Sequence, residues 1–211
     1  MPTAPLRAAD VLALHDAAPL APDAPDAGVM HWIAVNHRNN RLLWDEEDLA
    51  RRTTVSGDEI AANKRAIDGY NQARNDATER VDELLLVALG LVDEASARSD
   101  APRSNAGCSA RLNSETAGSM IDRLSILALK ARAMREQAAR SDVDDAHRTS
   151  ARARLARLRE QRADLAGCLD ALLADCLAGR AWFKVYRQFK MYNDPRFNPA
   201  LVAERDAKRN A

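Results

Sequence analysis

Residues Lys64–Leu86 read KRAIDGYNQARNDATERVDELLL, a stretch with no proline and a single glycine that predicts a long helix. Alternating steps of four and three residues from Ile60 define the face that such a helix turns toward a core. This face is apolar toward its C-terminal end, but its middle is polar and contains Lys64, Asn71, Arg74 and Thr78. Burying unpaired charge is costly, so partners or a ligand must satisfy these groups. The stretch therefore predicts a helical bundle with a buried polar site.

The composition of the whole chain agrees with a helical fold. Its 211 residues suffice for one domain with a sizeable core. Ala, Leu, Arg, Asp and Glu are abundant and β-branched residues are few, which favours helix. Lys plus Arg and Asp plus Glu are equal at 31 each, so no global field favours nucleic acid or a membrane surface. We expect an all-α bundle of about four long helices plus short terminal helices.

Pro, Gly and Ser punctuate the chain and predict its organisation. Residues 1–28 form a proline- and alanine-rich arm and linker with a short helical piece near Arg7–His15, and residues 29–211 form a single helical-bundle domain. Within that domain we expect long helices at about 31–52, 58–97, 114–140 and 144–178, then a shorter helix from Trp182 to the turn at Asn193. No segment is expected to form a strand.

Residues that cap helices mark several of these boundaries. Ser56 or Asp58 is available to cap the second long helix, and Ser114 or Thr116 to cap the third. Gly179 is suited to end the fourth, because glycine readily takes the left-handed conformation there.

Cysteine usage and the N-terminal sequence point to the cytoplasm. The three cysteines are odd in number and lack C-x-x-C spacing, which argues against a disulfide framework or a thiolate zinc site. The N-terminus lacks the pattern of a signal peptide, and no apolar stretch is long enough to span a membrane. No phosphate-binding loop, nucleophile elbow or di-iron motif occurs, so the sequence identifies no cofactor and no metal ligands.

The second long helix carries a polar stripe that overlaps its apolar face. The stripe follows steps of four and three through Lys64, Asp68, Asn71, Asn75, Glu79 and Asp82, and Arg74 flanks it. A solvated face with i,i+4 ion pairs is the ordinary meaning of such a stripe. The first long helix offers His37 and Asn40, and the third offers Glu115, Asp122, Arg123 and Lys130. We expect Asp122 and Arg123 to be buried, and Arg123 and Lys130, seven residues apart, to share a face.

The C-terminal segment RAWFKVYRQFKMYNDP contains most of the aromatic residues and a row of Lys and Arg. This composition occurs in segments that stack bases. It is more typical of an amphipathic helix that packs its rings on a bundle, so nucleic acid is not the expected partner.

Five ordered blocks resemble the bacterial family named domain of unknown function 4254: NHRNNRLLWDEEDLAR, KRAIDGYNQARND, NSETAGSMIDRLSILALK, EQRADL and YRQFKMYNDP. The resemblance spans roughly residues 31–199. The family's motif positions would map here onto Asn36, His37, Asn40, Trp44, Glu47, Asp48, Arg51, Lys64, Asp68, Asn71, Arg74, Asn75, Asp76, Asn113, Glu115, Asp122, Arg123, Lys130, Lys190, Tyr192 and Asn193. Members often lie beside genes for cell-envelope glycan glycosyltransferases, so the resemblance implies a glycan or sugar-nucleotide pathway by association.

Two hypotheses of function remain open. In the first, a pocket between the first three long helices binds, and in an enzyme transforms, a small anionic ligand. Lys64, Arg74, Arg123 and Lys130 would hold the anion, and Asn40, Asn71 and Asn75 would orient it. His37, Asp68, Glu115 and Asp122 are the candidates for proton transfer, because burial beside charge tunes a pKa.

In the second hypothesis, the protein is a non-catalytic helical adaptor for a glycosyltransferase or another protein partner. The polar face would then be an internal network that fixes helix register, and the aromatic C-terminal segment would be the docking surface.

Overall fold

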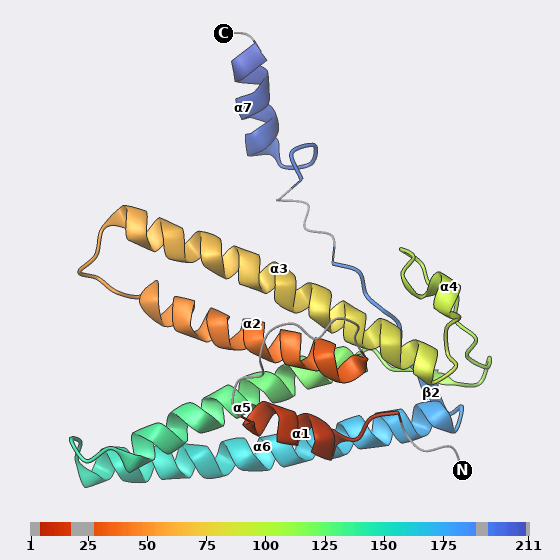
Figure 1. The fold of residues 1–211 in the computed structure, drawn as a ribbon, viewed down its shortest axis with the longest axis horizontal. Coiled ribbons are helices and arrows are strands. Elements are labelled where there is room, and N and C mark those ends of the chain that lie inside the picture. The colour runs from red at the N-terminus through yellow and green to blue at the C-terminus, as the bar shows by residue number, and fades with distance from the viewer. Residues whose placement is uncertain (1–4, 18–27, 189–193, 210–211) are drawn as a thin grey trace.

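The computed structural model describes residues 5–17, 28–188 and 194–209, and these form a bundle of helices (Figure 1). The long helices are α2 (Val29–Leu49), α3 (Gly57–Ala88), α5 (Ala117–Ala139) and α6 (Asp145–Leu177). The short helices are α1 (Ala8–Asp16), α4 (Glu94–Ala97) and α7 (Pro199–Arg209). The expected all-α bundle of four long helices is confirmed.

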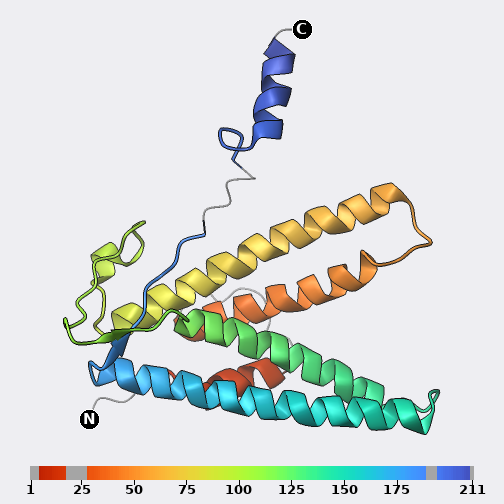
Figure 2. The ribbon, with the colours of Figure 1, turned by 180° about the vertical axis from the view of Figure 1, so that it is seen from behind.

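The long helices form two hairpins, one of α2 with α3 and one of α5 with α6. Figures 1 and 2 show the hairpins close together at one end and diverging toward their loops. Helix α1 contacts α2, α5 and α6 and so joins the two hairpins. The core lies where they meet and includes the fully buried Leu85, Leu124, Leu169 and Leu173.

Side-chain caps fix where three of the long helices begin. Ser56 and Glu59 form a capping box at the start of α3. Thr116 caps α5 by accepting from the backbone N–H of Ser119, and Asp144 caps α6 by accepting from that of His147. Each such cap stabilises its helix by about 1 kcal/mol. The sequence left the cap of α3 open between Ser56 and Asp58, and that of α5 open between Ser114 and Thr116. In the structure the caps are Ser56 and Thr116.

Glycines in the left-handed conformation end α3 and α6. Gly90 and Gly179 both have φ of 69°. After Gly179, the Arg180 N–H donates to Asp175 O at 2.9 Å, and after Gly90 the Leu91 N–H donates to Leu86 O at 2.9 Å. These are the six-residue hydrogen bonds of the Schellman motif. The predicted stop at Gly179 is confirmed, whereas the helix expected to reach Ala97 ends at Ala88, before Gly90.

The C-terminal segment differs most from expectation. Residues Ala181–Trp182 form strand β2, which pairs in parallel with strand β1 (Arg111–Leu112). Residues 183–188 then run on without helix, so the predictions of a helix from Trp182 and of no strand were wrong. The cause is tertiary, because Arg187 forms ion pairs with Glu79 and Glu83 of α3. The linker expected before residue 28 and the turn at Asn193 fall largely outside the described residues.

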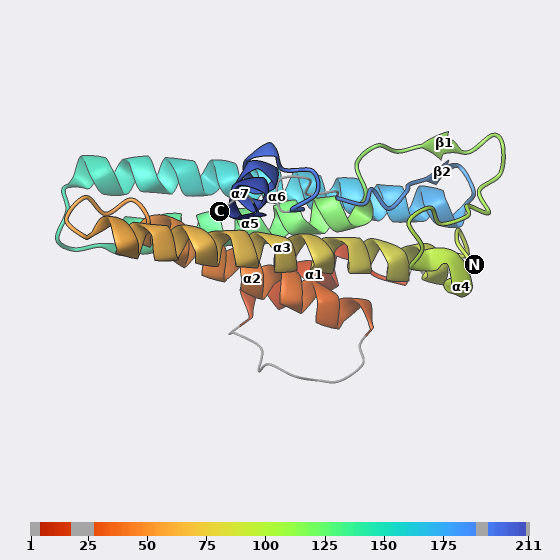
Figure 3. The ribbon, with the colours of Figure 1, turned by 90° about the horizontal axis from the view of Figure 1, so that it is seen from above.

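The two strands lie with α4 at the end of the bundle where α3 and α6 terminate (Figure 3). Helix α7 projects away from the bundle in Figures 1 and 2 and contacts no other helix or strand of the described chain. Its Leu201 and the preceding Phe197 are exposed.

Candidate functional site

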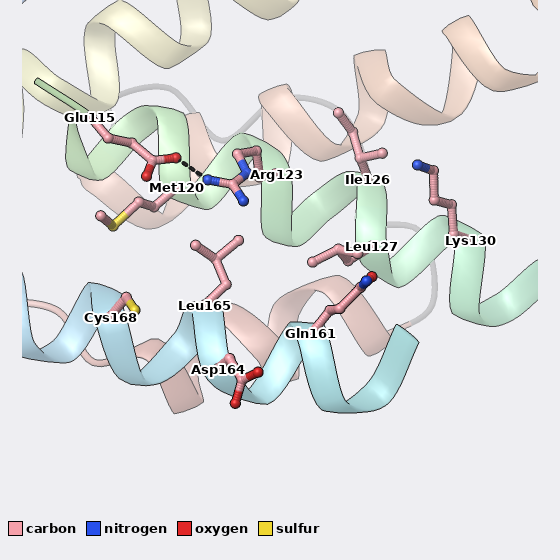
Figure 4. Close-up of a pocket in the computed structure, with 10 residues that line it drawn as sticks. All are labelled: Glu115, Met120, Arg123, Ile126, Leu127, Lys130, Gln161, Asp164, Leu165 and Cys168. Atoms are coloured by element: carbon pink, nitrogen blue, oxygen red, sulfur yellow. Dashed lines mark hydrogen bonds and ion pairs between the residues drawn. The ribbon is translucent and has the colours of Figure 1, made fainter. Parts of the chain in front are cut away.

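Facing stripes on α5 and α6 line a hollow, here called the α5–α6 groove. It has a volume of about 670 Å³. Helix α5 contributes Arg123, Ile126, Leu127 and Lys130, and α6 contributes Gln161, Asp164, Leu165 and Cys168. Steps of three and four residues place each set on one helix face. Figure 4 shows Glu115 and Lys130 toward opposite ends of the groove with Arg123 between them.

The charged groups of the groove are unevenly paired. Arg123 donates a hydrogen bond to Glu115, which lies just before the N-terminus of α5, where a carboxylate is favourable. Lys130 lies within 4.0 Å of no carboxylate in the described chain. The side chain of Arg123 is 57% exposed, so the expectation that it is buried was wrong, whereas its shared face with Lys130 is confirmed.

A second hollow of about 370 Å³, here called the Trp44 hollow, adjoins the groove at Lys130 and Gln161. Its other lining residues come from α2, α5 and α6: Trp44, Met134, Arg154, Arg157 and Leu158.

A network of polar side chains fills the interior between α2, α3 and α5. Asn36 donates to Thr78 Oγ1 at 3.0 Å and to Asp122 Oδ1 at 2.8 Å. Asn40 Nδ2 lies 2.8 Å from Asp122 Oδ1 and 3.0 Å from Ser125 Oγ. Asn36, Asn40 and Ser125 are buried. These groups satisfy one another, so these polar residues of α2, α3 and α5 form a hydrogen-bonded contact between the helices.

His37 extends this network toward α1. Its Nδ1 lies 2.8 Å from Ser125 Oγ, and its ring stacks on that of His15 with centroids 4.7 Å apart. Burial lowers the pKa of His37 to about 4 and that of His15 to about 3. Both rings are therefore neutral at pH 7, and an imidazole with so low a pKa is a weak base.

The middle of α3 places its candidates in three different surroundings. Half-buried Arg74 donates to Asn75 Oδ1 at 3.1 Å, and Asn75 donates to Gln188 Oε1 at 2.7 Å. Arg74 Nε is buried and has no hydrogen-bond partner in the described residues. Asn71 is half-buried, and Asp68 is exposed. Lys64 is exposed near the tip of the hairpin, 3.6 Å from Glu47.

Asp82 joins α3 to the N-terminus of α5. Its Oδ1 accepts from the Gly118 N–H at 2.6 Å, and a Cβ on Gly118 would lie 2.6 Å from Thr78 O. Burial raises the pKa of Asp82 to about 7, while hydrogen bonds from Thr116 and Gly118 act in the opposite direction. The arrangement fixes how closely the two hairpins approach.

The sequence candidates therefore divide among separate environments. Glu115, Arg123 and Lys130 line the α5–α6 groove, while His37, Asn40 and Asp122 belong to the interior network. The groove residues of α6 and, apart from Lys130, the lining of the Trp44 hollow were not among the candidates. The sequence pattern that could have identified them is the three- and four-residue spacing of one helix face, at Arg154, Arg157, Gln161, Asp164 and Cys168.

Two kinds of feature are absent from the described residues. No group of three or more His, Cys, Asp or Glu side chains is placed to hold a metal ion in residues 5–17, 28–188 and 194–209. In those same ranges, no helix combines the length and apolar character needed to cross a membrane.

Comparison with known proteins identifies a family. No curated protein and no solved structure matches the chain. A family model described as protein of unknown function DUF4254 matches residues 30–185, which includes α3, α5, α6 and all of α2 except Val29. The matched range contains the whole groove and the interior network. The chain therefore belongs to the DUF4254 family.

Proposed function

We propose that the protein binds a small anionic ligand in the α5–α6 groove. The observation that carries the proposal is the placement of Arg123 and Lys130 along one wall of a hollow of about 670 Å³. This volume lies within the range of small-molecule sites.

The lining suggests how a ligand would be held. Lys130, which has no carboxylate partner in the described chain, supplies a charge for the anion. The Gln161 amide can donate or accept a hydrogen bond, the Asp164 carboxylate can accept one from a ligand hydroxyl, and Leu127 and Leu165 offer apolar surface. If the ligand is transformed, Glu115 is the carboxylate of the groove that lies beside a cation and is available to move a proton.

A thermal-unfolding scan tests the proposal. The panel contains sugar nucleotides, nucleotides, phosphosugars, polyamines and divalent cations, because the family resemblance points to glycan or sugar-nucleotide metabolism. A ligand at 100 times its dissociation constant stabilises the folded protein by about 2.7 kcal/mol. We expect an anionic compound to raise the midpoint, and Arg123→Gln to reduce that shift. Arg135→Gln is the matched control, since Arg135 is exposed on α5 and outside the groove. No shift with any anion would contradict the proposal.

The alternative is an adaptor that docks a glycosyltransferase or another protein. Its support is the exposed C-terminal part, where Tyr186, Phe197 and Leu201 are exposed and α7 contacts no other described element. This alternative expects no ligand shift, and it expects deletion of residues 194–211 to abolish partner capture while leaving the unfolding midpoint unchanged.

A further inference from the structure

The Trp44 hollow combines an apolar floor with a cationic rim. Half-buried Trp44, Met134 and Leu158 come from α2, α5 and α6 and form the floor, and the exposed Lys130, Arg154 and Arg157 surround it. The lining contains three cations and no carboxylate. Such a surface matches a molecule that has one ring face and one strongly anionic group.

The positive charge at this hollow is not neutralised by its surroundings. Neither Lys130 nor Arg154 has a carboxylate within 4.0 Å in the described chain. Arg157 lies 3.7 Å from Glu160, but both side chains are exposed, and such pairs contribute little. The chain as a whole carries 31 charges of each sign. The cluster is therefore a local surplus, placed at the mouth of a hollow.

The position of the hollow sets a length for the ligand. Lys130 and Gln161 belong to both the groove and the hollow, and Arg123 lies seven residues before Lys130 on α5. At 1.5 Å per residue, the Cα atoms of Arg123 and Lys130 lie about 10 Å apart along α5, which is the scale of a ligand that contacts both side chains. Inorganic phosphate is too short for this span, whereas a phosphate group attached to a sugar or nucleoside is of suitable size.

We propose that the Trp44 hollow is the subsite for a phosphorylated ring. The ring face lies on Trp44, and Lys130, Arg154 and Arg157 hold the phosphate by charge-assisted hydrogen bonds. This inference rests on the proposed function, because the groove supplies the rest of the binding surface. A sugar phosphate and a nucleotide share the required chemistry, and the experiment distinguishes them.

Binding to the full-length protein is measured by isothermal titration with uridine 5′-diphosphate, glucose 1-phosphate, inorganic pyrophosphate, uridine and glucose. We expect one of the two phosphorylated rings to bind more tightly than pyrophosphate and than its own unphosphorylated ring. Which of them binds identifies the source of the phosphate. Replacement of Trp44 by Leu should weaken binding of that ring phosphate and leave pyrophosphate affinity unchanged.

Two double variants of α6 carry the test of the phosphate contacts. Arg154→Gln with Arg157→Gln removes two charges at the hollow, and we expect affinity to fall by about tenfold or more. Arg152→Gln with Arg159→Gln removes two exposed charges from the same helix outside the hollow and should change affinity less than about twofold. Because all four side chains are exposed, both variants should retain the wild-type unfolding midpoint. Arg154→Lys with Arg157→Lys provides a second, charge-preserving comparison and should retain part of the affinity.

Each outcome separates this inference from the proposed function. If the Arg154/Arg157 variant binds as wild type while Arg123→Gln does not, the groove binds the ligand and the subsite is wrong. Equal losses in the two double variants would show general electrostatic attraction and would also overturn the subsite. If none of these three anionic probes binds the wild-type protein, the subsite is wrong, whereas the proposed function is contradicted only if the whole thermal-unfolding panel also gives no shift with any anion.

Discussion

Asn40 shows why α2 carries polar residues on its inner face: they form hydrogen bonds with one another and with α5. It is 5% exposed, and its amide nitrogen lies within hydrogen-bond distance of Asn36, Asp122 and Ser125. Removing it would leave the buried Asn36 Oδ1 without its donor in the described chain and would take one of two donors from Asp122 Oδ1, and an unsatisfied buried acceptor costs more than the hydrogen bond itself contributes. One amide thus holds together polar groups from α2 and α5, and through Asn36 it is linked to α3.

Asn40→Ala should therefore lower the free energy of unfolding by about 1–3 kcal/mol. The matched control is Asn71→Ala, which removes a half-buried asparagine with no hydrogen bond in the described chain and should change stability by less than about 0.5 kcal/mol. Urea titration followed by circular dichroism measures both. Equal effects of the two substitutions would contradict the network.

Because His15 is buried, we expect it to make the free energy of unfolding depend on pH. Burial lowers its pKa to about 3 in the folded protein from an ordinary value of 6.5, and Arg162 and His37 act in the same direction. The unfolded chain therefore binds the proton first, so this part of the stability is complete above pH 6.5 and is lost as the pH falls toward 3. Both ring nitrogens are also buried without partners in the described residues.

His15→Leu should remove this loss. Thermal unfolding measures this as the midpoint of the variant minus the midpoint of the wild type. This difference should become more positive as the pH is lowered from 7 to 4. Asp82, whose pKa is raised to about 7, acts in the opposite sense, because its contribution is lost as the pH rises from about 4 to 7. Because both proteins contain Asp82, its contribution cancels when the midpoint of the wild type is subtracted from that of the variant. A difference that stays constant across this range would show that His15 is not the cause.

At the scale of elements, the crossing of α3 over α5 depends on Gly118. A Cβ there would lie 2.6 Å from Thr78 O and 2.9 Å from Asp82 Oδ1. The backbone of Thr78 cannot move freely, so the helices must separate. We expect Gly118→Ala to destabilise the protein by about 1–3 kcal/mol.

The control for this prediction is Gly69→Ala, also within a long helix but with open space around the added carbon. It should stabilise the protein by up to about 1 kcal/mol, because alanine is the better helix former. Chemical unfolding measures the free energy of unfolding of both variants. If α3 and α5 cross as closely as described, Gly118→Ala lowers this free energy and Gly69→Ala raises it. A stabilising Gly118→Ala would contradict it.

Local signals explain which elements the sequence predicts well. Ser56, Thr116 and Gly179 act within a few residues of their own positions, so their roles follow from spacing alone. The segment after Trp182 has helix-compatible spacing, but its conformation depends on β1 and on Glu79 and Glu83. Those partners lie about 70 to 110 residues earlier in the chain, and no local pattern identifies them.

At the scale of the whole molecule, the same distinction applies to the site. The shared face of Arg123 and Lys130 follows from their separation of seven residues on one helix. The Trp44 hollow was not predictable in this way, because it joins residues of α2, α5 and α6. The register of α6 against α5 and the reach of Trp44 across them are set by tertiary packing. The polar face of α3 was predicted as one site, whereas the structure separates its residues. Thr78 joins the interior network, Asn75 contacts Gln188, Asp82 contacts Gly118, and Lys64 and Asp68 lie on the surface.

Lys130 lies at the junction of the groove and the hollow, so its replacement tests the central claim most directly. The measurement is the thermal-unfolding midpoint of wild type, Lys130→Met and Lys184→Met with saturating uridine 5′-diphosphate or glucose 1-phosphate. Lys184 is an exposed lysine outside both hollows. The account predicts that one compound raises the midpoint of wild type and Lys184→Met and that Lys130→Met loses most of this shift. Equal shifts in all three proteins, or none in wild type, would contradict it.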